Sequence, residues 1–420
     1  MAVITSMTSP VHRVAPAARL LVVLLVGQAM ASMDGSIVVV AGPSISADLH
    51  TSGAALQLIL AGYLLIFAAL IVTGARLGDR YGHRRMFLAG LAGFTLASLA
   101  CGAAPGVAAL IAARGVQGAA AALMVPQVLS LIQLTFTGAA RARAIALYSM
   151  ILAVGVALGQ IVGGIVVTAD LAGAGWRPAF LLNVPVGVAL LVAGARLPVP
   201  ANPAAAIHRI DRVGVLLLAA GMTAVVAPLA LGRERGWPVW TWPTLAAGAA
   251  GLGLFLWYER RRASEPIVDL TVLRPAGVRP GLLACFAVMG AYAAFLFAIT
   301  LHLQGGLGYT PLAAGLSFVP YATGFAAASL GASRVPRRIR AGLPVAGPLA
   351  FAAAAGALAV LAGDGWPRLA SVPLLFVAGA GHAFGFSPLL TRIVGLVRPE
   401  QASALSALAS TGALLAGVLS

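Results

Sequence analysis

The sequence predicts an all-α integral membrane protein that crosses a lipid bilayer many times. Of its 420 residues, 60% are hydrophobic and only 9% are charged, whereas a soluble domain carries about 25% charged residues. Apolar stretches of about 20 residues recur along almost the whole chain, and each is long enough to cross the roughly 30 Å of hydrocarbon in a bilayer. Because backbone groups in lipid must be hydrogen-bonded within their own segment, we expect helices.

Thirteen membrane helices are expected in the order six, two and five, separated by the polar stretches 196–212 and 259–280. The predicted ranges are 18–40, 54–75, 86–104, 107–134, 143–169, 178–197, 213–231, 242–258, 281–303, 311–331, 343–362, 370–391 and 402–420. We therefore expect a six-helix bundle over residues 1–200, two linker transmembrane helices with cytoplasmic loops over 201–280, and a C-terminal bundle over 281–420. The last bundle, with five helices, is expected to be incomplete, as if a fourteenth helix were missing.

The distribution of basic residues predicts the topology. All 27 are arginines, and 22 of them lie at one set of helix ends, four at the opposite set, and Arg114 inside a helix. Cytoplasmic loops carry the excess of positive charge, so the N-terminus is expected to be cytoplasmic. The net charge of +16 then reflects topology, and no nucleic-acid partner is expected. The arginine-rich, lysine-free composition is typical of a high-GC bacterium, whose inner (plasma) membrane is the expected location.

The sequence shows no catalytic site. A phosphate-binding loop of the G-x-x-x-x-G-K-[ST] type requires a lysine, and the chain has none. The six histidines are scattered without metal-ligand spacing. Cys101 and Cys285 fall inside apolar segments, which favours packing over a disulfide or a metal site. We therefore expect neither an enzyme, nor a metal, nor a bound cofactor.

Two charged residues are expected inside the membrane. Asp34 lies well within the first predicted helix, and Arg114 lies about two turns into the fourth. Such residues are costly in lipid and usually functional. A carboxylate there can exchange a proton or pair with a cationic cargo. The alternatives are a structural pairing of Asp34 with Arg114, or an arginine that extends its head to the interface.

Two further segments carry recognisable patterns. Residues 74–85 read GARLGDRYGHRR, which places Asp79 among arginines in a tight turn that Gly82 permits. A simple positive-inside anchor would explain this segment as well. Residues 155–164 place small residues four apart on one helix face, which lets another helix approach closely. Tight packing is at least as good an explanation there as a contact with cargo.

These segments resemble the major facilitator superfamily. Residues 74–85 resemble its G-x-L-x-D-R-x-G-R-R signature, with Ala75 in place of the first Gly and His83 in place of the first basic residue. Residues 114–118 match its R-x-x-Q-G pattern in helix 4. Residues 155–164 resemble its antiporter motif, G-x-x-x-G-P-x-x-G-G, except that Gln160 replaces the proline.

Three more segments resemble the fourteen-helix drug:proton antiporters of that superfamily. Residues 33–43 resemble L-D-x-T-I-V-N-V-A-L-P, with Val39 at the position of Asn. Residues 176–187 resemble W-R-W-I-F-L-I-N-V-P-I-G, and residues 303–315 resemble Y-L-Q-x-x-x-G-Y-S-P-L-x-A-G. The resemblance covers nearly the whole chain.

The resemblance implies two helical bundles around a central cavity, with two extra helices between them in the chain. It implies proton-coupled efflux of hydrophobic or amphipathic, often cationic, drugs or metabolites by alternating access, with the proton gradient as the energy source. The implied partners are a lipophilic or cationic small molecule, protons and the bilayer, and the implied state is a monomer. Asp34 with Arg114 would couple to the proton or cation. The other implied sites are a gating loop, Asp79, Arg80, Gly82, Arg84 and Arg85, and an antiporter-like motif, Gly155, Gly159, Gln160, Gly163 and Gly164.

Several residues could face such a cavity, although packing explains each of the aromatic ones as well. They are Tyr63, Phe67, Gln117, Phe286, Tyr292, Phe295, His302 and Gln304. Two other functions stay open at this point. One is a proton-coupled importer or passive facilitator of another solute, which the replacement by Gln160 favours. The other is a truncated remnant that does not transport.

Overall fold

The computed structural model describes residues 11–170, 173–196, 211–232, 236–261, 270–363 and 365–398, together with Gln401, Leu405, Leu408 and Ala409. All regular structure in these residues is helical. The described residues contain nine helical spans that are long and apolar enough to cross a membrane. The expectation of an all-α, multi-pass membrane protein is therefore confirmed.

The first part of the chain forms the helices that the apolar stretches predict. They are α1 (Val11–Leu49), α2 (Gly53–Tyr81), α3 (His83–Gly102), α4 (Val107–Thr135), α5 (Gly138–Ala169), α6 (Arg177–Leu181) and α7 (Asn183–Ala195). The sixth predicted helix is broken into α6 and α7 near Leu182. Pro185 has no N–H to offer the carbonyl of Leu181, which accounts for the interruption.

The remaining helices also follow the predicted order. They are α8 (Arg212–Gly232), α9 (Thr241–Arg261), α10 (Val278–Leu301), α11 (Pro311–Ser317), α12 (Val319–Gly331), α13 (Arg337–Arg340), α14 (Leu343–Leu361) and α15 (Arg368–Leu396), with the short turns η3 (Leu270–Leu273), η4 (His302–Gly306) and η5 (Ala332–Arg334). The helix predicted at 311–331 is two helices, because Pro320 cannot donate to the carbonyl of Leu316. The helix predicted at 402–420 lies almost entirely outside the described residues.

One local expectation was wrong. The charged segment around Asp79 was predicted as a turn, but α2 continues through it to Tyr81 and α3 begins at His83. Gly82 alone makes the turn, with a φ of 94° that side chains disfavour. The charged residues of this segment are thus fixed on two helix ends instead of moving in a loop.

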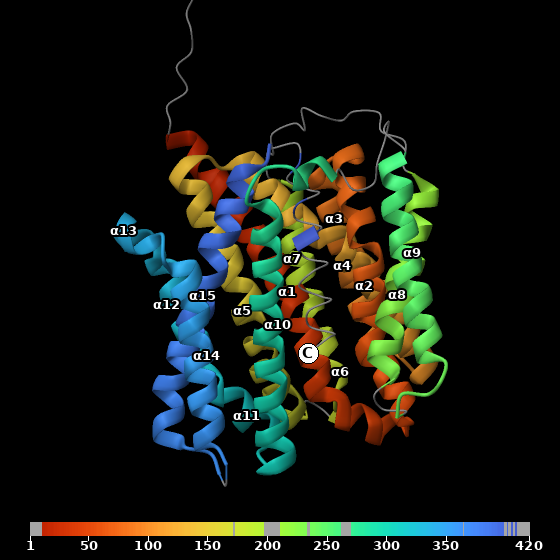
Figure 1. The fold of residues 1–420 in the computed structure, drawn as a ribbon. Coiled ribbons are helices and arrows are strands. Elements are labelled where there is room, and N and C mark those ends of the chain that lie inside the picture. The colour runs from red at the N-terminus through yellow and green to blue at the C-terminus, as the bar shows by residue number, and fades with distance from the viewer. Residues whose placement is uncertain are drawn as a thin grey trace, which may run out of the picture.

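The helices run roughly parallel and form two groups (Figure 1). In the first group α4 packs against α2 and α3, and α1 packs against α5; in the second, α15 packs against α12 and α14. Helix α5 also contacts α11, α12 and α15. It therefore joins the two groups along their boundary, where a cavity between them has to lie.

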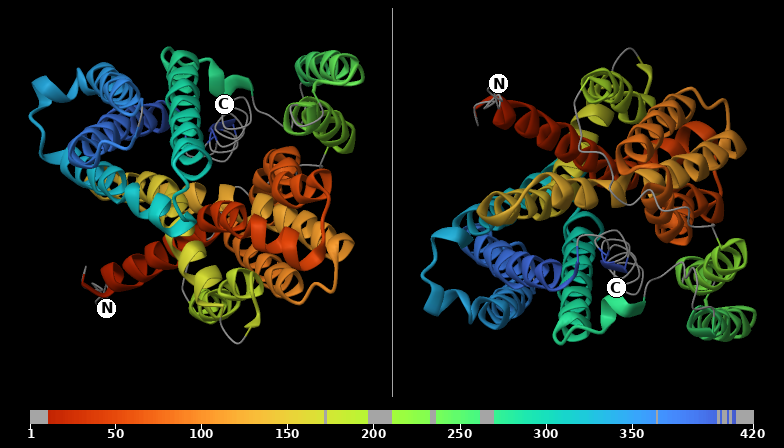
Figure 2. Two further views of the ribbon diagram at one scale, coloured as in Figure 1. Left: turned by 90° about the horizontal axis from the view of Figure 1, so that it is seen from below. Right: turned by 90° about the horizontal axis from the view of Figure 1, so that it is seen from above.

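The helices α8 and α9 are central in the chain but peripheral in space. Figure 2 shows this pair at the edge of the molecule, away from the boundary between the two groups. Helix α8 packs against α9 and against α2. The pair is thus attached to the first group of helices and does not separate the two groups.

Candidate functional site

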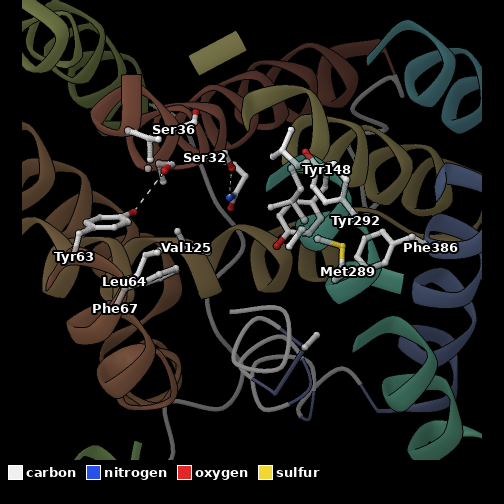
Figure 3. Close-up of a pocket in the computed structure, with 18 of the residues that line it drawn as sticks. Ser32, Ser36, Tyr63, Leu64, Phe67, Val125, Tyr148, Met289, Tyr292 and Phe386 are labelled. Carbon is white, nitrogen blue, oxygen red and sulfur yellow. Dashed lines mark hydrogen bonds between the residues drawn. The ribbon is translucent and has the colours of Figure 1, made fainter. Parts of the chain in front are cut away.

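A cavity of about 540 Å³ lies between the two groups of helices (Figure 3). Its walls come from α1, α2, α4 and α5 on one side and α10 and α15 on the other, with Ala409 also contributing. None of the described lining residues carries a charge. Its polar lining residues are Gln28, Ser32, Ser36, Tyr63, Tyr148, Gln160, Tyr292 and Thr300. The remaining wall is apolar, so the cavity suits a lipophilic molecule with a few hydrogen-bonding groups.

The aromatic rings are divided between the two sides of this cavity. Figure 3 shows Tyr63 and Phe67 on one side and Tyr292 and Phe386 on the other. The rings of Tyr63 and Phe67 are stacked, with centroids 5.8 Å apart. A flat molecule between the two groups would therefore contact ring faces or edges from both.

Gln28 supplies the least satisfied polar group of the wall. Its amide nitrogen donates to Ser32 Oγ at 3.3 Å, while its side-chain oxygen is buried without a partner. A buried acceptor left unpaired costs about 1–3 kcal/mol. Because Gln28 lines the cavity, a turn of its side chain would let this oxygen accept from a hydroxyl or N–H group of a cargo.

Beside the cavity lies an ion pair that is almost completely shielded from solvent. The guanidinium of Arg114 donates to a carboxylate oxygen of Asp34, and the two side chains are 0% and 1% exposed. The second carboxylate oxygen accepts from the amide nitrogens of Gln117 at 2.8 Å and Asn183 at 3.1 Å. Both amides also donate to Ser98 Oγ. This network ties α1, α3, α4 and α7 together.

Further contacts hold the guanidinium of Arg114. Its Nε donates to the carbonyl of Ile59 at 3.2 Å, and its central carbon lies 4.5 Å from the ring centre of Tyr63. Cations gain energy over such a ring face, and more so when both are desolvated. Its Nη2 nitrogen is buried without a hydrogen-bond partner.

Tyr63 separates this ion pair from the cavity. Its ring lines the cavity and also covers Arg114, and its hydroxyl donates to the carbonyl of Ala31 at 3.5 Å. Gly35 and Ser36, which follow Asp34 in α1, line the cavity as well. The ion pair is therefore one side chain away from the space that a cargo would occupy.

The glycines of α5 allow two other helices, α1 and α11, to approach closely. Added Cβ atoms at Gly155 and Gly159 would lie 2.7 Å from Ser32 Cβ and 2.1 Å from Ser36 Oγ, so both glycines allow α1 to approach. Gly163 continues the same face. Gly164 points elsewhere, where a Cβ would lie 3.1 Å from the Cα of Leu312 in α11. Close packing therefore explains all four, and Gln160 of the same motif lines the cavity.

The predicted gating residues cluster where α2 meets α3. One carboxylate oxygen of Asp79 lies 3.5 Å from a guanidinium nitrogen of Arg76, and the other lies 3.6 Å from Nε2 of His83. Arg84 donates to the carbonyls of Gly194 and Ala195 at the end of α7, a favourable position for a cation. Arg80 lies over the ring of Tyr81, and Arg85 is exposed.

A second buried polar cluster lies in the second group of helices. His382 in α15 is 1% exposed, and its Nδ1 shares a hydrogen bond with the hydroxyl of Tyr321. Its ring centre lies 4.8 Å from that of Tyr292 and 4.9 Å from that of Phe325. No charged side chain takes part in this cluster among the described residues.

The structure places the remaining predicted residues as follows. Tyr63, Phe67 and Tyr292 line the cavity, whereas Gln117 belongs to the ion-pair network. Phe286, Phe295 and His302 do not line it, and the side chain of Gln304 lies outside the described residues. No group of three or more His, Cys, Asp or Glu residues in the described part of the chain could hold a metal ion.

Sequence reasoning missed several residues of the site. They are Gln28, Ser98, Tyr148, Asn183 and Phe386. Asn183 and Gln28 could have been singled out, because an amide inside an apolar segment needs a partner. Tyr148 and Phe386 carry no such signal, since an aromatic residue packs equally well in any helix.

The chain is similar in sequence to a known family and to several curated proteins. The family model described as "Major Facilitator Superfamily" matches residues 24–420. The "Probable actinorhodin transporter" of Streptomyces coelicolor is 41% identical over 302 residues, which cover 71% of this chain and 52% of that protein. The "Puromycin resistance protein" of Streptomyces alboniger is 34% identical, covering 95% of this chain and 79% of its own. The chain spans about half the length of the first three curated relatives.

Solved structures share the fold. A proton:xylose symporter superposes with a TM-score of 0.68 at 14% identity, over 96% of this chain and 87% of that one. A human organic anion transporter gives a TM-score of 0.66 at 16% identity, over 96% and 92%. At such low identities the likeness concerns the fold alone.

Proposed function

The chain belongs to the major facilitator superfamily, and from this premise we propose that it is a secondary transporter that exports a lipophilic small molecule in exchange for protons by alternating access. Its membership of this superfamily agrees with the expectation that it is not an enzyme. The observation that carries the proposal is the uncharged, partly aromatic cavity with a buried ion pair directly behind its wall. Relatives named as export or resistance proteins support the direction.

The lining favours an uncharged or weakly basic cargo over a strongly cationic one. No carboxylate is found among the described residues of the cavity wall, and the carboxylate of Asp34 is already paired with Arg114 behind Tyr63. A cation would be offered ring faces and neutral oxygens only, while an uncharged aromatic molecule would find apolar walls, aromatic rings and a few neutral polar groups. We therefore propose lipophilic cargo and rank cationic cargo second.

Asp34 is the proposed proton site. A proton on its carboxylate would remove the charge that holds Arg114, and a buried charge without its partner costs about 3–5 kcal/mol. Arg114 would then have to shift relative to Asp34. Because the pair joins α1 to α4, protonation would loosen one side of the cavity wall. This links proton binding to the shape of the cargo site.

We propose that the segment around Asp79 gates this movement from the cytoplasmic ends of the helices, and that the N-terminus lies on that side. The close contact of Gly164 with Leu312 supports a role for α5 in joining the two groups. The division into units at residues 1–200, 201–280 and 281–420 is part of the same proposal, as is the monomeric state.

The test is dye efflux from bacterial cells that express this chain. Two lipophilic dyes would be compared, the cation ethidium and the uncharged Nile red, with and without a protonophore. We expect efflux that stops when the proton gradient collapses, with the uncharged dye preferred. Asp34→Asn should abolish gradient-driven efflux. Efflux that persists without the gradient, or unchanged efflux by this variant, would contradict proton coupling through Asp34.

A further inference from the structure

His83 joins the end of α2, the start of α3 and the second half of α4 at the gating segment. It begins α3 directly after the turn at Gly82, and it is only 6% exposed. Its Nδ1 lies 2.8 Å from the side-chain oxygen of Gln127 in α4. Its Nε2 lies 3.6 Å from a carboxylate oxygen of Asp79 in α2. Both ring nitrogens therefore face acceptors.

The neighbouring hydrogen bonds fix which nitrogen carries a proton. The amide nitrogen of Gln127 donates to the carbonyls of Gly74 at 2.8 Å and Leu123 at 3.0 Å. This orientation leaves the amide oxygen facing His83, and such an oxygen only accepts. Nδ1 must therefore be protonated. In neutral His83 the unprotonated nitrogen is then Nε2, whose lone pair faces the carboxylate of Asp79.

The backbone makes room for this arrangement. A Cβ at Gly78 would lie 2.0 Å from the side-chain oxygen of Gln127 and 2.7 Å from Nδ1 of His83. Any other residue at Gly78 would displace one of these two side chains. The absence of a side chain at Gly78 therefore allows the contact between His83 of α3 and Gln127 of α4.

The charged groups around His83 come from two of the three helices. Helix α2 contributes Arg76, Asp79 and Arg80, α3 contributes Arg84 and Arg85, and α4 contributes the neutral Gln127. Arg76 already pairs with Asp79 at 3.5 Å. A protonated His83 would be a second cation beside the carboxylate of Asp79. Unlike Arg76, it can lose its charge by losing a proton.

We propose that His83 is a proton-binding site that strengthens the junction of α2, α3 and α4 when the medium at this end of the protein is acidified. One proton from water binds Nε2, and the resulting imidazolium donates to both Asp79 and Gln127. Histidines exchange this proton near neutral pH. The contact is strongest while His83 is protonated and weakens when the proton leaves. The chain thereby carries a titratable cation where the resembled signature has a permanent one.

This regulation rests on the proposed gating role, but its test needs no transport. In the full chain with Cys101→Ser and Cys285→Ser, the cavity residue Ala293 is changed to Cys and its labelling by a water-soluble methanethiosulfonate reagent is timed in detergent. Ala293 lines the cavity on α10, so labelling reports how open the cavity is. His83 is compared with His83→Arg, which is always charged, and His83→Gln, which is always neutral.

Rates are compared between these proteins at each pH, because the shared cysteine cancels the pH dependence of thiol chemistry. We expect the His83 protein to match His83→Arg near pH 5.5 and His83→Gln near pH 8.5, with roughly a threefold difference between the two variants, typical of a partly exposed ion pair. His50→Gln, at the far end of α1, is the matched control and should leave the profile unchanged.

Two results would overturn the assignment. One is a constant ratio of the His83 and His83→Arg rates across pH, and the other is equal labelling of the two His83 variants. If neither variant folds, Asp79→Asn with His83 retained should abolish the pH dependence, and a retained dependence would overturn the proposal. Failed dye efflux with an intact labelling profile would remove the proposed export function and leave the His83 site standing.

Discussion

The two groups of helices each bury a polar cluster behind a tyrosine of the cavity wall, and the two clusters differ in charge. In the first group, Tyr63 covers the ion pair of Asp34 and Arg114. In the second, Tyr292 lies against the neutral His382, which is bonded to Tyr321. Even the packing is similar, because Gly118 in α4 abuts the carbonyl of Tyr63, and Gly379 in α15 abuts the carbonyl of Tyr321.

Proton binding should disturb the contacts of the first cluster more than those of the second. In the first group a proton would disrupt a permanent charge pair held by amides and a ring face. In the second, the imidazole lies among aromatic rings, and its Nε2 is buried without a partner. Similar helix packing thus supports a charged cluster on one side and an aromatic one on the other. The proposed coupling accordingly belongs to the first group.

The largest effect is expected from Arg114→Leu. It leaves the carboxylate of Asp34 buried without its cation, which should lower the free energy of unfolding by about 3–5 kcal/mol. The measurement is the thermal unfolding midpoint of the purified chain in detergent. Adding Asp34→Asn to this variant should restore part of the loss. A single variant as stable as the double one would show that the pair does not act as a unit.

The two glycines test whether the similar packing has similar importance. A Cβ at Gly118 would lie 2.4 Å from the carbonyl oxygen of Tyr63, and one at Gly379 would lie 2.0 Å from that of Tyr321. Because backbone cannot move aside easily, Gly118→Ala and Gly379→Ala should each lower the unfolding free energy by about 1–3 kcal/mol. Gly253→Ala is the control, since nothing lies within 4 Å of its added Cβ, and it should be neutral or stabilising. A loss of stability in only one of these two variants would show that the two glycine contacts are not equivalent.

His382→Phe should have a smaller effect than Arg114→Leu. Phenylalanine can keep the ring contacts with Tyr292 and Phe325, so the loss is mainly the hydrogen bond to Tyr321, whose buried hydroxyl is left unpaired at a cost of about 1–3 kcal/mol. The same thermal midpoint measures it, and Tyr321→Phe in addition should cost nothing more. A loss as large as that of Arg114→Leu would mean that His382 carries a charge.

The smallest effect is expected from an exposed ion pair. A carboxylate oxygen of Asp48 at the end of α1 lies 2.7 Å from a guanidinium nitrogen of Arg177 and accepts from Trp176, but the side chains of Arg177 and Asp48 are 31% and 45% exposed. Water screens such a pair, and the asparagine oxygen of Asp48→Asn can still accept from Trp176. The thermal midpoint should therefore not change measurably. A clear shift would show that burial is not what separates this pair from that of Asp34 and Arg114.

The sequence predicted the fold far better than the site. Apolar length fixes membrane helices directly, so twelve of the predicted helices overlap described ones, although α1 and α2 extend further than predicted and two of the predicted helices are broken. The pairing of Asp34 with Arg114 is one of the alternatives that the sequence predicts, because opposite charges buried in one bundle avoid the cost of an unpaired charge. Gln28, Tyr148 and Phe386 could not be found this way, because their role depends on which faces of α1, α5 and α15 converge.

Local geometry also limited the prediction around Asp79. Clustered charges and a glycine resemble a loop in sequence, but arginine has good helix propensity and one glycine is enough for the reversal. The pairing of His83 with Gln127 joins residues 44 positions apart. Only the packing of α3 on α4 brings them together.

The peripheral position of α8 and α9 offers a practical landmark for imaging. This pair is anchored on α2 and stands clear of the boundary between the two groups. The segment before α9 exposes Trp240, and the first turn of α9 exposes Trp242. A rigid antibody fragment raised against this corner would add mass for particle alignment in electron cryomicroscopy without covering the cavity. Because the fragment would be attached to the first group of helices, any displacement of the second group could be measured relative to the first.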